Sequence, residues 1–289
     1  MRARHAGAIE RRAALALLGA AALVPRQGRA QAATSAARVV ALGGTVTEIV
    51  YALGAGDRLV GVDDSSLYPE AATRLPKVGY YRGFSVEGVA SLAPDLVLAS
   101  DQAGPPQAMA QLRRLGPRVV VLPSAPTLDA LAHRIEGAAA ALDRREPAQA
   151  LVAQIRREVK RMAQLPGGQR VLLVSSRTGK LEGAGRETAA DAMIRLAGAV
   201  NVLGGERGYK PLSGEGAAAL APDVIVTTTM SVAASGGLDA FVAQPGIAVT
   251  PAARKRRVVV MDDLLLVGFG PRLPEALRQL RAGLAGAMP

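Results

Sequence analysis

The sequence predicts an α/β protein of two lobes, each built on a parallel sheet, and three observations carry this prediction. Short unbroken apolar runs, such as 38–42 and 170–174, alternate with stretches of helical periodicity, which is typical of parallel strands covered on both faces. One sequence unit occurs twice: residues 208–228 repeat much of residues 79–100 in altered form. Between the copies, residues 127–165 have helical spacing and little strand character, which indicates a helical connection.

Each half opens with a strand and a helix. The run 38–42 is followed by a capping-box pattern at 45–48, which predicts a helix that continues to Leu53. A similar pattern at 188–191, with Asp in place of Glu, predicts a helix that ends near Leu196. The two halves therefore share an order of elements and differ in loop length.

The repeated unit itself predicts a short helix and a strand in each half. Ser85 and Ser213 are the expected N-caps of the two helices. The sequence Leu-Ala-Pro-Asp follows both helices and leads into apolar runs at 96–99 and 224–227, which we expect to be strands.

The segment between the halves predicts a stiff connection. Pro147 is acceptable in the first turn of a helix, and the apolar residues after it recur at helical spacing over roughly eighteen residues, about 27 Å at the standard rise. We expect a domain order of signal peptide (1–32), N-terminal lobe (33–145), connecting helix (146–166) and C-terminal lobe (167–289).

The first 32 residues have the three parts of a secretory signal peptide. Arginines at 2–12 precede an uncharged apolar stretch at 13–24 and a small-x-small cleavage site at 30–32. The apolar stretch is too short to span a bilayer, so we expect a mature chain that begins near Ala33 and is not membrane-embedded. The adjacent pair Arg11-Arg12 leaves twin-arginine export and an ordinary basic leader both open.

The composition of the chain limits the cellular compartment in which it works and the classes of partner that it can bind. The chain contains no cysteine, so neither a disulfide framework nor a lipid-modified cysteine is available, and a bacterial periplasm is the simplest location. The formal net charge is +11, but the leader carries six arginines and one glutamate, which leaves +6 for the rest. We interpret the basic run 254–257 as a solvated loop and expect no nucleic-acid partner and a monomer.

Catalytic residue types are scarce. His133 is the only histidine after the leader, and its place in a predicted helix favours an exposed side chain over a ligand. Without cysteine or a second histidine, a protein-only zinc or iron site is not expected. A secreted enzyme such as a hydrolase is therefore not favoured, and no G-x-S-x-G elbow supports it.

The loop 75–82 contains the most unusual residues of the chain, Tyr80-Tyr81 followed by Arg82. Loop tyrosines commonly pack the ring against the protein and leave the hydroxyl in water. A phenolate, however, is a hard anionic oxygen suited to ferric iron, tyrosine is one of the axial ligands of haem, and a nearby guanidinium would stabilise the anion.

These residues carry a resemblance to a known family. The stretch LPKVGYYRGFSVEGVASLAPDLVLAS resembles the haem-binding proteins of bacterial ABC haem importers, and so do GYKPLSGEG, TAADAMIRLAG and MDDLLLVGFGPR. The resemblance covers most of residues 38–280. Its Val-Gly-Tyr-x-Arg element is specific to haem binding, whereas the rest is shared with binding proteins for vitamin B12 and ferric siderophores.

The resemblance implies two lobes joined by a helix, with ligand held between them. Tyr80 matches the axial tyrosine of the family and Arg82 the arginine that hydrogen-bonds it, while Tyr81 occupies a position that the family fills variably. Because the halves are duplicated, we expect Tyr209 and Lys210 to face these residues across the cleft.

The second lobe departs from some relatives in one loop. Those relatives add a histidine after the strand equivalent to 172–174, and this chain has 175–180 there without histidine. Arg177 in that loop is the remaining candidate for a ligand contact. A second axial ligand from this side is therefore left open, as is the number of haems, one or two.

Glu87 and Glu215 complete the candidate residues. They match the pair of glutamates with which relatives dock onto arginines of the membrane permease, and compensation of helix dipoles is the alternative. The resulting hypothesis is a periplasmic protein, not an enzyme, that captures haem and delivers it to an inner-membrane ABC permease with its ATPase. The alternative ligands are cobalamin and a ferric siderophore, and the rival class is a secreted haem-processing enzyme such as a chelatase.

Overall fold

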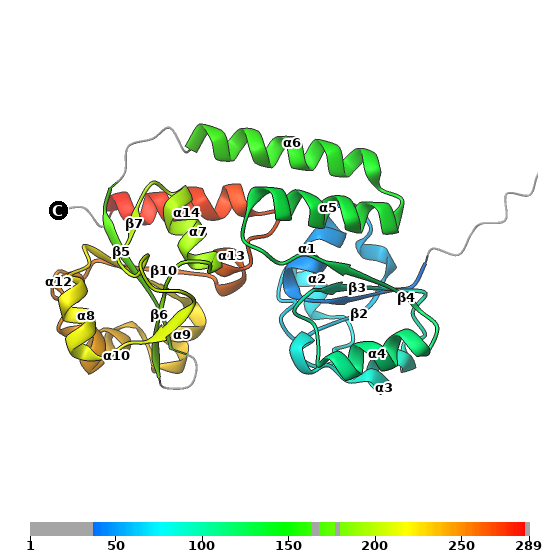
Figure 1. Ribbon diagram of the computed structural model, residues 1–289, viewed down its shortest axis with the longest axis horizontal. Helices are drawn as coiled ribbons and strands as arrows, with labels where there is room; N and C mark the ends of the chain where they lie inside the picture. Colours follow the sequence, from blue (N-terminus) through cyan, green and yellow to red (C-terminus); the bar gives the residue numbers. More distant parts are fainter. Residues whose placement is uncertain (1–36, 163–167, 177–179, 287–289) are drawn as a thin grey trace, which may run out of the picture. The chain divides into compact units, whose positions relative to one another are not determined.

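Two sheets organise the chain (Figure 1). The computed structural model describes residues 37–162, 168–176 and 180–286. The predicted signal peptide and Arg177 lie outside these residues. Within the described ranges, no helix is both long enough and apolar enough to cross a bilayer.

The first lobe has a four-stranded parallel sheet in the order β2-β1-β3-β4. Alternate residues of its strands bury opposite faces: Val39 and Leu96 lie in one core cluster, and Val40 and Val97 lie in another. This double burial explains why the strands are unbroken apolar runs. Its elements are β1 (Val39–Leu42), α1 (Gly44–Ala52), η1 (Gly56–Arg58), β2 (Leu59–Val62), α2 (Glu70–Thr73), η2 (Tyr81–Gly83), α3 (Val86–Ser91), β3 (Leu96–Ser100), α4 (Pro106–Arg114), β4 (Arg118–Leu122) and α5 (Leu128–Leu142).

The second lobe has a mixed sheet in the order β10-β9-β5-β6-β8, with β7 beside β5. The strands β10, β9 and β5 are parallel, as predicted, and the sheet is extended by two strands that the sequence did not indicate: β6 pairs antiparallel with β5, and β8 pairs antiparallel with β6. Its elements are β5 (Arg170–Ser176), β6 (Leu181–Ala184), α7 (Ala189–Leu196), β7 (Val200–Asn201), β8 (Tyr209–Pro211), α8 (Gly214–Leu220), β9 (Val224–Thr228), α9 (Thr229–Ala234), α10 (Leu238–Ala243), α11 (Pro245–Ala248), α12 (Pro251–Arg254), β10 (Val258–Met261), α13 (Asp263–Val267) and α14 (Leu273–Gly286).

The predicted helix starts are confirmed in three places and wrong in one. Ser85, Ser213 and Thr188 each accept a hydrogen bond from the third residue after them, as N-caps do. The first helix has no such cap, because it begins at Gly44 after Gly43. The side chains of the expected capping box are used for contacts with residues more than two hundred positions away.

The repeated Leu-Ala-Pro-Asp unit has a structural role in each lobe. Asp95 accepts the backbone N–H of Arg38 at 2.8 Å, and Asp223 accepts that of Arg170 at 2.9 Å. Each arginine side chain also donates to the carbonyl of the leucine in the unit. The unit therefore fixes the start of the first strand in both halves.

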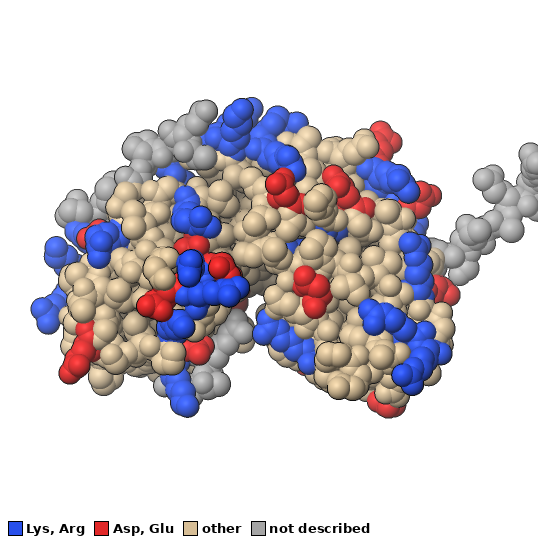
Figure 2. Space-filling view, in the orientation of Figure 1, with Lys and Arg blue, Asp and Glu red and all other residues tan. Residues whose placement is uncertain are grey.

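A long helix joins the halves, as predicted. It is α6 (Arg145–Met162), and it lies along α5 and α14 (Figure 1). Arg156 pairs with Asp129 of α5 at 2.8 Å, and Glu158 pairs with Arg278 of α14 at 2.7 Å. Beneath these helices one core cluster includes residues of β1, β3, β5 and β9, so both lobes share apolar packing. Basic side chains cover the outer face of α6 (Figure 2).

Candidate functional site

Polar groups gather where the parallel strands of the first sheet end. Gly43, Asp63 and Gln102 follow β1, β2 and β3, and Ser124 follows β4. Their hydrogen bonds bring them together: Gly43 N donates to Asp63 Oδ1 at 3.0 Å, and Gln102 Nε2 donates to Ser124 Oγ at 2.8 Å. In open α/β sheets, ligands bind in the crevice outside this carboxyl edge.

The tyrosine loop is attached to the same edge. The backbone N–H of Tyr81 donates to Asp63 Oδ2 at 3.3 Å, and its carbonyl accepts from Gly104 N at 3.0 Å. The rings of Tyr80 and Tyr81 meet edge to face with centroids 4.7 Å apart, and the Arg82 guanidinium lies 5.4 Å from the centre of the Tyr81 ring. The structure thus brings together the three predicted residues of this loop.

The two adjacent tyrosines have different surroundings. Tyr80 is 42% exposed, whereas Tyr81 is half-buried beside an apolar cluster that includes Phe84. The pKa of Tyr81 is raised to about 12, mainly by burial and in addition by the hydrogen bond and charge of Tyr80, while the neighbouring Arg82 lowers it in part. Of the two side chains, Tyr80 is therefore the more accessible to a ligand.

Sequence reasoning missed two residues of this edge. Gln102 accepts a hydrogen bond from Arg82 Nη2 while its own amide group is oriented by Ser124. Asp63 is fully buried and accepts hydrogen bonds from Gly43, Ser65, Ser66 and Tyr81. A carboxylate directly after a buried strand was the available signal for Asp63, and nothing in the sequence distinguishes Gln102.

The carboxyl edge of the second sheet carries a separate polar network. Ser176 N, at the end of β5, donates to Ser231 Oγ at 3.0 Å, and Thr228 at the end of β9 meets the same hydroxyl at 2.9 Å. The backbone N–H of Met230 donates to Asp263 Oδ2 at 2.9 Å. The Met230 residue is 47% exposed, so a large apolar side chain extends from this edge.

The second copy of the tyrosine unit has a different backbone from the first. Residues 81–83 form a 3-10 turn, whereas Tyr209 and Lys210 lie on the strand β8, where they pair with Ala184 and Gly183. Both Tyr209 and Lys210 are exposed. The two copies of the unit therefore have the same structure at the capping serines and at Leu-Ala-Pro-Asp, and different structures at the tyrosine.

Residues 263–272 of the second lobe contact α1 of the first. Thr45 Oγ1 donates to Gly268 O at 2.8 Å, and Arg272 Nε donates to Glu48 Oε1 at 3.0 Å. Burial raises the pKa of the Glu48 carboxyl to about 7, because the ion pair with Arg272 offsets only part of the cost of removing the charge from water. The two carboxyl edges are thus linked through α1.

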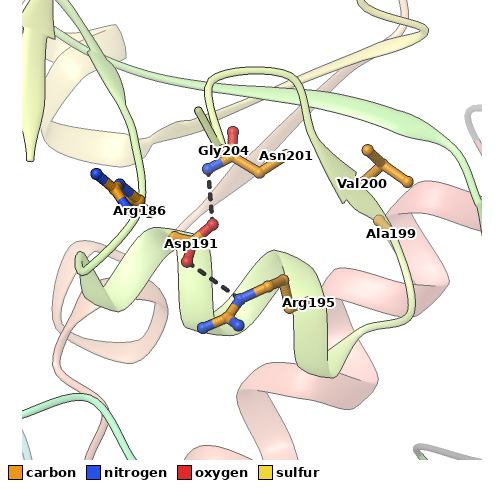
Figure 3. Close-up of a pocket in the computed structure, with 7 residues that line it drawn as sticks. All are labelled: Arg186, Asp191, Arg195, Ala199, Val200, Asn201 and Gly204. Carbon is orange, nitrogen blue, oxygen red and sulfur yellow. Dashed lines mark hydrogen bonds and ion pairs between the residues drawn. The ribbon is translucent and has the colours of Figure 1, made fainter. Parts of the chain in front are cut away.

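A pocket of about 440 Å³ opens elsewhere, beside α7 (Figure 3). Asp191 on its floor pairs with Arg195 at 3.1 Å and accepts from Asn201 Nδ2 at 2.9 Å, while Arg186 extends from the loop on the other side. Val200 and Asn201 pair with the first residues of β5, so this pocket lies at the opposite end of that strand from the carboxyl edge. Its polar groups brace α7 against β7.

Glu87 and Glu215 occupy equivalent places in the two lobes. Each is the second residue of its helix, α3 or α8, and each is exposed. Ser85 and Ser213 cap the two helices through Gly88 N at 2.9 Å and Gly216 N at 3.1 Å. The repeat therefore presents one carboxylate at the start of a short helix on each lobe.

Two α/β lobes that share a long helix, with polar groups at the carboxyl edges of their sheets, define a class of ligand-binding proteins. The chain belongs to the periplasmic binding protein family, whose model matches residues 39–265. The substrate-binding lipoprotein YvrC of an uncharacterized Bacillus subtilis ABC transporter is 30% identical over 251 residues, 84% of this chain and 78% of the relative. The vitamin B12-binding protein of Vibrio vulnificus is 43% identical over 79 residues, 27% of this chain and 29% of the relative.

Solved structures give a closer likeness. The periplasmic heme-binding protein BhuT in complex with two hemes is 44% identical, with a TM-score of 0.80 over 87% of this chain and 98% of BhuT. The apo form of the periplasmic heme-binding protein RhuT from Roseiflexus sp. RS-1 is 39% identical, with a TM-score of 0.83 over 87% of this chain and 99% of RhuT. These relatives are binding proteins, and their fold is that of the whole described chain.

Proposed function

We propose that this chain binds haem in the periplasm and delivers it to an ABC permease and its ATPase in the inner membrane. The observation that carries the proposal is the position of Tyr80, an exposed tyrosine at the carboxyl edge of the first sheet with Arg82 in the same turn. The likeness to BhuT and RhuT supports haem as the ligand.

Tyr80 is the proposed axial ligand of the ferric iron. A phenolate oxygen is among the known axial ligands of haem iron, and Tyr80 has the accessibility that such a ligand requires. Arg82 supplies positive charge beside the tyrosine pair, which favours an anionic oxygen there. Tyr81, which is half-buried against an apolar cluster, packs beside the ligand instead of binding the iron.

The second lobe closes the proposed cleft. Tyr209 and Lys210 are its proposed ligand contacts, and the ammonium group of Lys210 suits the propionate carboxylates of haem. Glu87 and Glu215 are the proposed docking residues, since one relative is an ABC transporter substrate-binding lipoprotein and both carboxylates are exposed. The leader of the chain is proposed to direct export and to be cleaved near Ala33.

Cobalamin is the second candidate ligand, because a vitamin B12-binding protein shares 43% identity with part of the chain. Cobalamin would leave Tyr80 as a packing residue. Its corrin is already occupied by cobalt, so no phenolate-to-iron band would form.

The deciding experiment is a titration of the purified mature chain with hemin, followed by absorption and resonance Raman spectroscopy, beside an equal titration with cyanocobalamin. We expect stoichiometric haem binding with a tyrosinate-to-iron charge-transfer band and no change of the haem on incubation. Tight binding of cobalamin with no hemin spectrum would replace haem by cobalamin, and turnover of the haem would indicate an enzyme.

A further inference from the structure

Arg272 joins the two lobes through a cluster that the sequence did not indicate. Its Nε and Nη2 atoms both donate to Oε1 of Glu48, and its guanidinium carbon lies 3.6 Å from the centre of the Tyr68 ring. The side chains of Glu48 and Arg272 are only 3% and 16% exposed. The backbone fits closely around them, because a Cβ on Gly270 would lie 2.9 Å from Glu48 Oε2.

Tyr68 is the last residue of a turn, residues 63–68, whose large apolar side chains are not buried. Tyr68 and Leu67 are 44% and 49% exposed. A segment with few buried apolar contacts depends on its polar and ring contacts for order. The stacking of Arg272 on Tyr68 is therefore a substantial restraint on the end of this turn.

The start of the same turn holds the tyrosine loop. Asp63 Oδ2 accepts the N–H of Tyr81 at 3.3 Å, and Asp64 N donates to the carbonyl of Gly79 at 3.0 Å. Ser66 binds Asp63 Oδ1 at 2.8 Å, so the middle of the turn is tied to its start. Hydrogen bonds thus connect the turn to the residues on both sides of Tyr80.

We propose that Arg272, a residue of the second lobe, is a positioning residue for the tyrosine loop of the first lobe, and that it acts through Tyr68 and the turn 63–68. Only the expected effect on haem binding rests on the proposed function. The restraint on the tyrosine loop is present in the ligand-free chain. A shift of one lobe against the other would be felt at the loop that carries the proposed iron ligand, because Glu48 holds the guanidinium in place.

Hydrogen exchange of the ligand-free chain tests the restraint directly. In Arg272→Ala and in Tyr68→Ala, we expect amides of 63–68 and 79–84 to exchange about tenfold faster, while amides of β1 and β5 keep their wild-type rates. Tyr68→Phe, which keeps the ring that Arg272 covers, should behave as the wild type. Arg278→Ala is the matched control, because it removes an arginine and an ion pair from α14 on the side of α6.

Haem release gives the second readout. Transfer of haem to apomyoglobin should be about tenfold faster from Arg272→Ala and Tyr68→Ala than from the wild type, Tyr68→Phe or Arg278→Ala, with a shifted tyrosinate band. Should Arg272→Ala not fold because Glu48 is left buried alone, Tyr68→Ala and the double variant Glu48→Gln with Arg272→Met carry the test.

The outcomes separate the two proposals. Unchanged exchange at 79–84 in folded Arg272→Ala and Tyr68→Ala would overturn the positioning role, and so would an equal acceleration of every segment, which indicates a general loss of stability. A wild-type chain that binds no haem would overturn the proposed function and leave the exchange result to decide the restraint.

Discussion

At the scale of single residues, two neighbours in the sequence have opposite properties. Tyr80 is exposed, whereas Tyr81 is half-buried, is held by Asp63 and Gly104, and has a pKa raised to about 12. The proposal that Tyr80 and not Tyr81 binds the iron therefore rests on the accessibility of the two side chains and not on their type.

Tyr80→Phe should therefore abolish the tyrosinate-to-iron band of the haem complex, because the only change is the loss of the ligand oxygen. Tyr81→Phe should retain the band, since the ring that packs in the apolar cluster remains. Absorption and resonance Raman spectra of both variants check this, with circular dichroism as the control for folding. Loss of the band in Tyr81→Phe alone would assign the iron to the other tyrosine.

Arg82→Ala should release haem about tenfold faster than the wild type, which corresponds to about 1.4 kcal/mol, the usual contribution of a hydrogen bond to a charged group. Arg82→Lys should lie between the two, because an ammonium keeps the charge and loses the planar contact with Gln102. Haem transfer to apomyoglobin measures the rates. Arg113→Ala, an exposed arginine of α4, is the control, and an equal effect there would indicate loss of general surface charge.

At the scale of elements, α1 shows how tertiary contacts can redirect a local pattern. Residues 45–48 fit a capping box, yet Thr45 donates to Gly268 O and Glu48 binds Arg272. The helix starts instead at a close approach, where a Cβ on Gly44 would lie 2.3 Å from Ser65 O. The capping residues serve the contact between lobes.

The burial of Glu48 makes stability depend on pH, because it raises the pKa of this carboxyl more than Arg272 lowers it. The folded chain holds the Glu48 proton more tightly than the unfolded chain, since the pKa rises from 4.5 to about 7. The stabilising contribution is complete below 4.5 and is lost as the pH rises through about 7, by up to about 3 kcal/mol. Urea unfolding between about pH 5 and about pH 8 should show this decline in the wild type, and a much flatter profile in Glu48→Gln.

Glu70→Gln is the control for that measurement, because Glu70 forms an exposed ion pair with Arg74 at 2.5 Å. Exposed pairs of this kind contribute at most about 1 kcal/mol, so its profile should follow the wild type. A wild-type profile with no decline over this range would show that Glu48 ionises freely in the folded chain.

At the scale of the whole molecule, the duplicated halves present Glu87 and Glu215 from equivalent helix starts. A core cluster that includes strands of both lobes, with α6 across it, restrains the separation of the two carboxylates. Two fixed negative charges suit a two-fold permease that bears arginines.

Single substitutions Glu87→Ala or Glu215→Ala should weaken haem delivery only in part, because exposed charge pairs contribute about 1 kcal/mol or less each, and the double variant should weaken it severely. Uptake through the cognate permease in membranes measures delivery, beside hemin titration of the same variants. Haem binding should remain normal. Normal delivery by the double variant would return both glutamates to a helix-dipole role.

Much of the fold could be predicted because its signals are local. The runs 39–42 and 96–99 are buried on both faces of their sheet, so every residue in them is apolar, and the serine caps satisfy backbone groups within three residues. The antiparallel strands β6 and β8 were missed because they are short, and β8 is exposed at every position, so neither carries the apolar run that marks a buried strand.

The sequence by itself determined the two α/β halves, the helix between them and the unusual pair Tyr80 and Arg82, since periodicity, capping and composition are properties of neighbouring residues. Only the tertiary structure decided that Tyr80 is exposed while Tyr81 is half-buried, and that Glu48 meets Arg272 across 224 positions. Burial and long-range ion pairs depend on which segments the fold brings together. No local pattern encodes them, because each half of such a contact looks like an ordinary polar residue of its own helix or loop.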